Sequence, residues 1–177
     1  LLVVIFSVIF GAAIGEFLRI ETKLESLGSY IEHRLAGRSG DTASFTRGFV
    51  TASLVFCVGS MAIVGSLESG LTGNHQTLYA KSILDGVTSL IFASTLGIGV
   101  LFSGAAVFLY QGAITMTAVV MKNFLVAETI SQMTSVGGLL ILAIGLNLLG
   151  LTNIRVGNLL PGIFLPLLYF TVRSLFT

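Results

Sequence analysis

The sequence predicts an all-α protein, a polytopic bundle of transmembrane helices that forms a single membrane domain over residues 1–177. Of the 177 residues, 54% are hydrophobic and only 10% are charged, whereas a soluble domain carries about 25% charged residues. The mean hydropathy is +0.99. Glycine occurs 21 times, and small residues let helices pack closely in lipid. These observations exclude a soluble enzyme and a disordered tail. The net charge of +1 is too small to attract a polyanion such as nucleic acid.

A helix needs about 20 mainly apolar residues to cross a hydrocarbon core of roughly 30 Å. The apolar run Ile83–Met121 is twice that length, so it predicts two spans with a break in Ser94–Gly104, where small residues cluster. With this division, the sequence predicts six spans, over residues 1–18, 48–67, 83–99, 102–121, 136–151 and 158–172.

The segment between the first two spans has a different pattern. Its apolar residues recur every three or four positions, which places them on one helix face: Ile20, Leu24, Leu27, Ile31 and Leu35. This pattern predicts an amphipathic helix over residues 19–36. The helix either continues the first span or turns to lie on the membrane surface. Residues 37–42 then predict a flexible linker.

Basic residues predict the orientation, because short cytoplasmic loops are enriched in lysine and arginine. Lys81 is the only lysine or arginine in residues 68–82, and Lys122 is the only one in residues 122–135. Residues 19–47 hold five basic residues: Arg19, Lys23, Arg34, Arg38 and Arg47. We therefore expect residues 19–47 and Arg155 on the cytoplasmic side of a bacterial inner membrane, and residues 68–82 and 122–135 outside.

The first residues predict neither a signal peptide nor a natural start. Leu1 is not methionine, and no basic region precedes Leu1–Ile14, so we expect a truncated or processed end, or the first ordered residue of a longer chain. Leu1–Phe6 also matches Leu159–Phe164 at four of six positions. Because these segments lie in oppositely directed spans, the match suggests an inverted repeat.

No arrangement of catalytic residues is apparent. Cys57 lies in an apolar run, where a thiol packs as a small hydrophobe, and His33 and His75 lie far apart in polar stretches. We therefore expect no enzymatic activity, no metal and no cofactor.

Polar groups inside the predicted spans are the informative signal, because each is costly unless it is paired or hydrated. Asp85 is either an interfacial carboxylate or an ion ligand, and the amides either bridge helices or line a polar path. Serines commonly bond their own helix carbonyls, and Glu16 lies at the spacing of an ion pair with Arg19. The pathway candidates are Asn158, Asn147, Gln111, Asp85, Ser60 and Arg155.

Interruptions of the predicted helices add a second signal, since transporters build substrate sites from broken helices. The candidates are Gly59, Gly97, Gly99, Pro161 and Gly162, and kinks without function are the alternative. Gly11 and Gly15 form a Gly-x-x-x-Gly packing face.

The most specific prediction places the functional centre at residues 155–162. Inside an α-helix Pro161 would free the carbonyl of Gly157, with Gln111 and Asn147 forming the opposite wall. Alternatively, Pro161 lies in a first helical turn and Asn158 caps that helix.

Eight segments carry a resemblance: Gly48–Leu54, Phe56–Ile63, Lys81–Gly86, Phe92–Ser103, Tyr110–Gly112, Gly137–Leu142, Gly145–Leu149 and Ile154–Pro161. Together they resemble the domain-of-unknown-function 554 family, the YdfK/YqgA-like bacterial inner-membrane proteins. The resemblance implies a helical membrane fold, a transport-related role without an established activity, and roughly two further N-terminal spans.

We therefore predict a small secondary transporter or channel for an ion or small polar solute. Its partners are the bilayer, that solute and a second copy of the chain, since dimers are the commonest symmetric assembly. The alternatives are a non-transporting membrane scaffold or assembly protein and, less favoured, an intramembrane enzyme. A continuous polar path would favour transport, and a dry interior would favour the scaffold.

Overall fold

A computed structural model describes residues 2–35, 42–121 and 127–175, and all regular secondary structure in these ranges is helical. The predicted linker lies mostly outside the described residues, as does Lys122. The elements in chain order are α1 (Leu2–Leu18), α2 (Ile20–Leu35), α3 (Thr42–Val58), α4 (Ser60–Thr72), α5 (Gln76–Leu96), α6 (Gly99–Met121), α7 (Ala127–Leu148), the 3₁₀ helix η3 (Val156–Ile163) and α8 (Leu165–Leu175).

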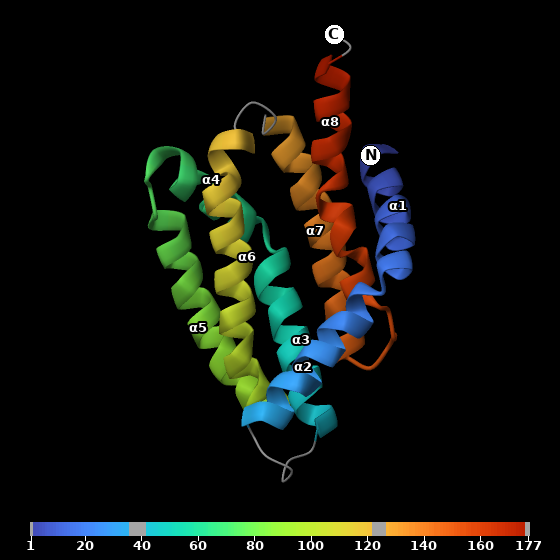
Figure 1. Cartoon of the computed structure of the whole chain (residues 1–177), viewed down its shortest axis with the longest axis vertical. Helices are drawn as coiled ribbons and strands as arrows, with labels where there is room; N and C mark the ends of the chain where they lie inside the picture. The colour runs from blue at the N-terminus through green and yellow to red at the C-terminus, as the bar shows by residue number, and fades with distance from the viewer. Residues whose placement is uncertain (1, 36–41, 122–126, 176–177) are drawn as a thin grey trace.

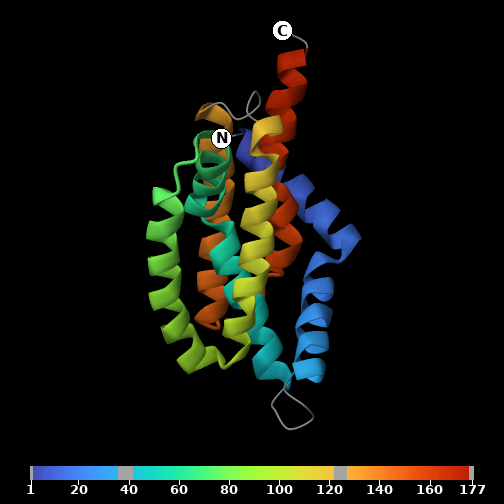
Figure 2. The ribbon, with the colours of Figure 1, turned by 60° about the vertical axis from the view of Figure 1, so that its left-hand side comes forward.

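The long helices form one bundle in which α5, α6, α7 and α8 alternate in direction, whereas α1–α2 and α3–α4 are bent pairs (Figures 1 and 2). The turn between α5 and α6 and the α2–α3 end lie at the lower end in Figure 1, and the α4–α5 connection lies at the upper end. The heart of the bundle is apolar and tightly buried, with Phe49 of α3 and Met133 and Leu140 of α7 each 1% exposed. The sequence prediction of an all-α transmembrane bundle is confirmed.

Three elements are long and apolar enough to cross a membrane alone: Gly99–Val119, Ala127–Leu148 and Val156–Arg173. The bent pairs α1–α2 and α3–α4 raise the count to five if each is one span. The predicted count of about six therefore exceeds the three to five candidate spans found among the described residues. The difference is α5, which has 21 residues but carries Lys81 and Asp85, whose charges lower its hydropathy.

Large apolar side chains cover the outside of the α5–α6 pair. Leu90, Phe108 and Met116 are 73%, 77% and 85% exposed. Exposed apolar area of this kind would be a liability in water, whereas lipid tails solvate it. The exterior therefore agrees with a membrane environment.

The helix breaks fall at three of the predicted glycine positions or beside them. Gly59 is extended (φ −62°, ψ 145°) and separates α3 from α4, which are bent by 58°. Gly97 has φ +83° and ends α5, and Gly99 is the first residue of α6. The break in residues 83–121 thus lies inside Ser94–Gly104 as expected. Gly97 and Gly99 form the turn between the antiparallel helices α5 and α6 (Figure 2), and neither interrupts a helix.

The predicted amphipathic helix is α2, and it is bent by 50° from α1 at Arg19, whose φ is +51°. Leu24 and Ile31 pack against the core, and a Cβ on Gly28 would lie 3.1 Å from the Phe49 ring. The apolar face of α2 therefore covers α3.

Candidate functional site

Helix α1 and the 3₁₀ helix η3 lie against each other backbone to backbone. A Cβ on Gly11 would lie 2.4 Å from the Gly162 Cα, and a Cβ on Gly15 would lie 1.8 Å from the Asn158 carbonyl oxygen. Only glycine permits this approach. The predicted Gly-x-x-x-Gly face is therefore the surface on which η3 packs, and it brings residues 143 and 151 positions apart into contact.

The N-terminal turns of α2 and η3 cap each other where they meet. The Glu21 carboxylate Oε2 accepts a hydrogen bond from the Gly157 backbone N–H at 2.5 Å, and Asn158 Oδ1 accepts one from the Glu21 N–H at 2.8 Å. The first amides of a helix have no partner within it, so each element supplies an acceptor for the other. We call this arrangement, formed by Glu21, Gly157 and Asn158, the reciprocal cap.

Glu16, at the end of α1, completes the polar cluster. Its Oε2 accepts a hydrogen bond from Asn158 Nδ2 at 2.5 Å, and its Oε1 pairs with Arg155 at 3.2 Å. Asn158 is 5% exposed, so its amide is held between two carboxyl-bearing residues inside the protein. The predicted ion pair between Glu16 and Arg19 is replaced by this longer-range one, because the chain turns at Arg19.

Pro161 acts differently from the prediction, because Val156–Ile163 is a 3₁₀ helix and not an α-helix. In the tighter helix each carbonyl pairs with the amide three residues later. Proline has no amide hydrogen, so the carbonyl that loses this partner is that of Asn158 and not that of Gly157. It is the Asn158 carbonyl that lies against Gly15. Asn158 also caps α2, not its own helix as the alternative reading expected.

Asn147 fastens the connection between α7 and η3. Its Oδ1 accepts hydrogen bonds from the Thr152 hydroxyl at 2.7 Å and the Ile154 N–H at 2.9 Å, and its Nδ2 donates to the Ile154 carbonyl at 2.6 Å. These side-chain hydrogen bonds therefore all go to residues 152–154. The residue lies near the reciprocal cap and holds the loop that leads to Arg155.

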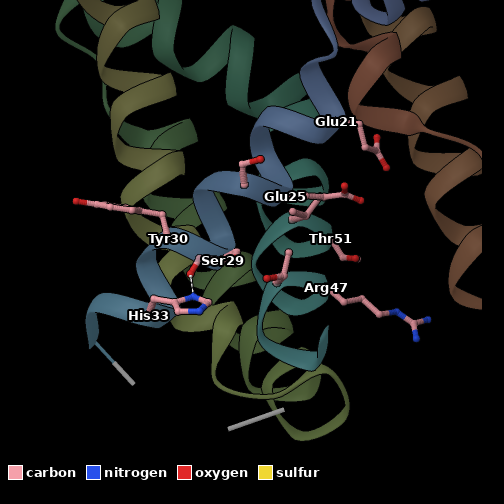
Figure 3. A pocket seen from close by; sticks show the side chains of 10 residues that line it. Glu21, Glu25, Ser29, Tyr30, His33, Arg47 and Thr51 are labelled. Carbon is pink, nitrogen blue, oxygen red and sulfur yellow. Dashed lines mark hydrogen bonds between the residues drawn. The ribbon is translucent and has the colours of Figure 1, made fainter. Parts of the chain in front are cut away.

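A groove of about 1020 Å³ lies between α2 and α3. Glu21, Glu25, Thr51 and Arg47 point toward the same side of this helix pair, and Tyr30 points toward the other (Figure 3). His33 Nδ1–H donates a hydrogen bond to the Ser29 carbonyl at 2.8 Å (Figure 3).

A second pocket of about 80 Å³ continues from this groove, since Glu21, Arg47, Val50 and Thr51 line both, and Asn147 and Ile154 line its far end. Glu21, Arg47 and Thr51 therefore form a polar wall that the two pockets share, and the rest of the smaller pocket is mostly apolar.

A separate polar pocket of about 260 Å³ lies between α3, α5 and α6. Lys81 and Asp85 form an ion pair there, and Gln111 lines the same pocket. Lys81 was expected in an external loop, but it lies within α5 and is 6% exposed. Gln111 was expected opposite Asn158 with Asn147, but it lines this other pocket. The side chain of Ser60 lies outside the described part of the structure.

The sequence prediction missed several residues of these sites, among them Glu21, Thr51 and Lys81. Glu21 could have been found from the sequence, since an acidic residue in the first turn of a helix interacts favourably with the helix dipole. Lys81 could also have been found, since it precedes Asp85 by four residues on a helix. In the ranges that the structure describes, no three His, Cys, Asp or Glu residues lie close enough together to hold a metal ion.

The similarity to known proteins extends over nearly the whole chain. YdfK of Bacillus subtilis (strain 168), an uncharacterized membrane protein, is 33% identical over 162 residues, which are 92% of this chain and 67% of the relative. YqgA of Escherichia coli (strain K12), an uncharacterized protein, is 29% identical over 165 residues, which are 92% of this chain and 70% of the relative. No solved structure matches. The family model for proteins of unknown function DUF554 matches residues 1–171, and the chain therefore belongs to the DUF554 family as a membrane protein.

Proposed function

We propose that this chain is a small secondary transporter or channel for an ion or small polar solute in the bacterial inner membrane. The observation that carries the proposal is the continuity between the α2–α3 groove and the reciprocal cap. Glu21 lines the groove, lines the smaller pocket beyond it and bonds the Gly157 amide at the cap. A polar route thus ends where two interrupted helices meet, which is how transporters hold solutes within the membrane.

The orientation proposed for this route places its wide end in the cytoplasm. Residues 19–47 hold five basic residues, and basic residues favour the cytoplasmic side. The groove is built from α2 and the first half of α3, so it would open inward. Helix α1 and η3 run in opposite directions, since Gly11 meets Gly162 and Gly15 meets Asn158. This supports an inverted repeat, although residues 2–6 are α-helical and Leu159–Phe164 is mainly 3₁₀.

We expect the chain to self-associate, with a dimer as the simplest closed assembly. Mass measurement in mild detergent and in nanodiscs tests this, and a monomer at every concentration contradicts it.

We also expect no enzymatic activity. Ser69 and His75 are hydrogen-bonded at 2.8 Å, but the pair lies at the exposed α4–α5 turn and lines none of the pockets described above.

Transport is tested by reconstituting the chain in proteoliposomes and measuring the flux of a panel of ions and small polar solutes. Saturable flux of at least one solute above that of empty liposomes supports the proposal. Glu21→Gln keeps the size of the side chain but removes its charge, and it should lower that flux. A protein that is folded and moves nothing in the panel would favour the scaffold alternative.

A further inference from the structure

Glu21 and Arg47 carry opposite charges and line both the α2–α3 groove and the smaller pocket beyond it. Among the described residues that line the smaller pocket, they are the only charged ones. In the part of the chain that the structure describes, no ion pair joins their side chains. The two spaces therefore share one carboxylate and one guanidinium group that do not neutralise each other by direct contact.

The two charged groups are held differently. The Glu21 Oε2 accepts a hydrogen bond from the Gly157 N–H at 2.5 Å, so the reciprocal cap fixes this carboxylate beside the smaller pocket. The Arg47 side chain is exposed and has no hydrogen-bonded or ion-paired partner among the described residues. Its five N–H donors are therefore available, and a guanidinium group binds a carboxylate through two parallel hydrogen bonds.

The surface between these charges is polar on one side and apolar on the other. Thr51 lies between Glu21 and Arg47 on the side toward which all three side chains point (Figure 3). Asn147 also lines the smaller pocket, but its side-chain bonds already go to residues 152–154. The apolar wall includes three side chains that are at most 7% exposed: Val50, Leu54 and Ile144.

We propose that the solute of this route is a small zwitterion, namely an α-amino acid with a short aliphatic side chain. Its carboxylate pairs with Arg47, its ammonium group pairs with Glu21, and its side chain lies against the apolar wall. The smaller pocket has a volume of about 80 Å³, whereas drug-sized ligands occupy about 300–1,000 Å³, so only a short side chain fits. Binding stands on this geometry, and passage of the amino acid through the membrane rests on the proposed function.

Solutes that carry a single charge match the pocket less well. A simple anion would pair with Arg47 but would lie near the Glu21 carboxylate, and a simple cation would meet the reverse arrangement. Glu25 lines the groove and not the smaller pocket, so it makes the entrance less favourable still for an anion. A zwitterion pairs with both charges, and burial of its side chain against the apolar wall adds hydrophobic stabilisation.

The test measures binding to the purified full chain in nanodiscs by titration calorimetry and thermal unfolding. The probes are glycine, L-alanine and L-valine. Each is compared with its amide, which lacks the carboxylate, and with the acid that lacks the amino group (acetate, propionate or isovalerate). At least one of these amino acids should bind and raise the melting temperature by about 2–4 °C at saturation. Its amide and its deaminated acid should each bind at least about tenfold more weakly, because each lacks one charge-assisted pair.

Two substitutions identify the partner of each charged group. Arg47→Gln should weaken binding of the amino acid about tenfold or more and remove its advantage over the amide. Glu21→Gln should remove its advantage over the deaminated acid, while the new side-chain oxygen can still accept the Gly157 N–H. Lys23→Gln and Glu128→Gln are the matched controls. Both remove a charge from an exposed residue that lines neither space, and both should bind as the parent does.

Failure of all these amino acids to bind overturns the inference, as does equal affinity of the parent chain for the amide or the deaminated acid. Unchanged binding in Arg47→Gln also overturns it. If Glu21→Gln does not fold, Arg47→Gln decides alone, since that exposed side chain has no partner among the described residues.

Flux in proteoliposomes separates this inference from the proposed function. Amino-acid binding with the expected variant pattern, but without flux of any solute, supports the binding site and contradicts transport. Flux of another solute by a chain that binds none of the amino acids supports transport and overturns the inference.

Discussion

Asn158 connects three helix ends through one small amide: its oxygen bonds the first turn of α2 and its nitrogen bonds Glu16 at the end of α1. The sequence drew attention to this residue because it stands beside Pro161 and Gly162, which interrupt a predicted span. Its partners could not be predicted, since they lie 137 and 142 positions away. For the same reason Glu16 was assigned to its neighbour Arg19. Spacing along the sequence predicts pairs between neighbouring residues. Only the folded structure shows which distant residue takes the place of the predicted neighbour.

The variant Asn158→Ala should lose both stability and flux. It leaves the Glu21 amide and the Glu16 carboxylate without their buried partner, at a cost of about 1–3 kcal/mol, and it opens the cap at the end of the proposed route. Thermal unfolding in detergent and flux per folded molecule in proteoliposomes measure the two effects.

The control for this substitution is Asn74→Ala. Asn74 bonds Glu68 at the α4–α5 turn, away from the groove, so its loss should change stability by about 1 kcal/mol and leave flux per folded molecule unchanged. Normal flux in Asn158→Ala after correction for folded protein would refute the assignment of the cap to the solute route.

At the scale of elements, breaks that depend on glycine were predictable and the type of helix was not. Gly97 has φ +83°, a conformation that glycine adopts readily, and the break there was expected. The 3₁₀ geometry of η3 was not expected, because it depends on the approach of α1. Gly11 and Gly15 let that helix come so close that η3 is fixed by contacts across the bundle, and periodicity in a single segment cannot show this.

A methyl group at Gly15 should separate these two elements. The Cβ of Gly15→Ala would overlap the Asn158 carbonyl oxygen, so the backbone must move, and we expect a loss of about 1–3 kcal/mol. Gly138→Ala is the matched control, because a Cβ there meets nothing within 4 Å, and it should be neutral or stabilising by up to about 1 kcal/mol. Chemical denaturation in mixed micelles compares the two. Equal stability of both variants would show that the α1–η3 contact is looser than described.

Across the whole molecule, the course of the helices brings the facing ends of α2 and α3 and the α5–α6 turn to one end and the α4–α5 connection to the other (Figure 1). Composition was sufficient to predict the helical membrane class, because lipid requires apolar surfaces whatever the topology. It was not sufficient for the number of spans, because Lys81 and Asp85 lower the hydropathy of α5, which the predicted count includes and the measured length and hydropathy do not. Which end faces the cytoplasm depends on the distribution of basic residues.

Single-cysteine labelling tests that orientation in a Cys57→Ala background. Arg34→Cys lies on α2 and Gln76→Cys at the start of α5, and both parent residues are exposed. In right-side-out vesicles an impermeant maleimide should label Gln76→Cys at once and Arg34→Cys only after permeabilisation. The reverse pattern would mean that the α2–α3 groove opens outward.

The measurement that tests the central claim most directly is inhibition of solute flux by a hydrophilic thiol reagent at Thr51→Cys. Thr51 lines both the groove and the pocket beyond it, so a bulky adduct there should block the route and lower the flux in proteoliposomes at least tenfold. Ser135→Cys, at an exposed position of α7, should be labelled with no loss of flux. Undiminished flux through fully labelled Thr51→Cys would contradict the claim that solute passes between α2 and α3.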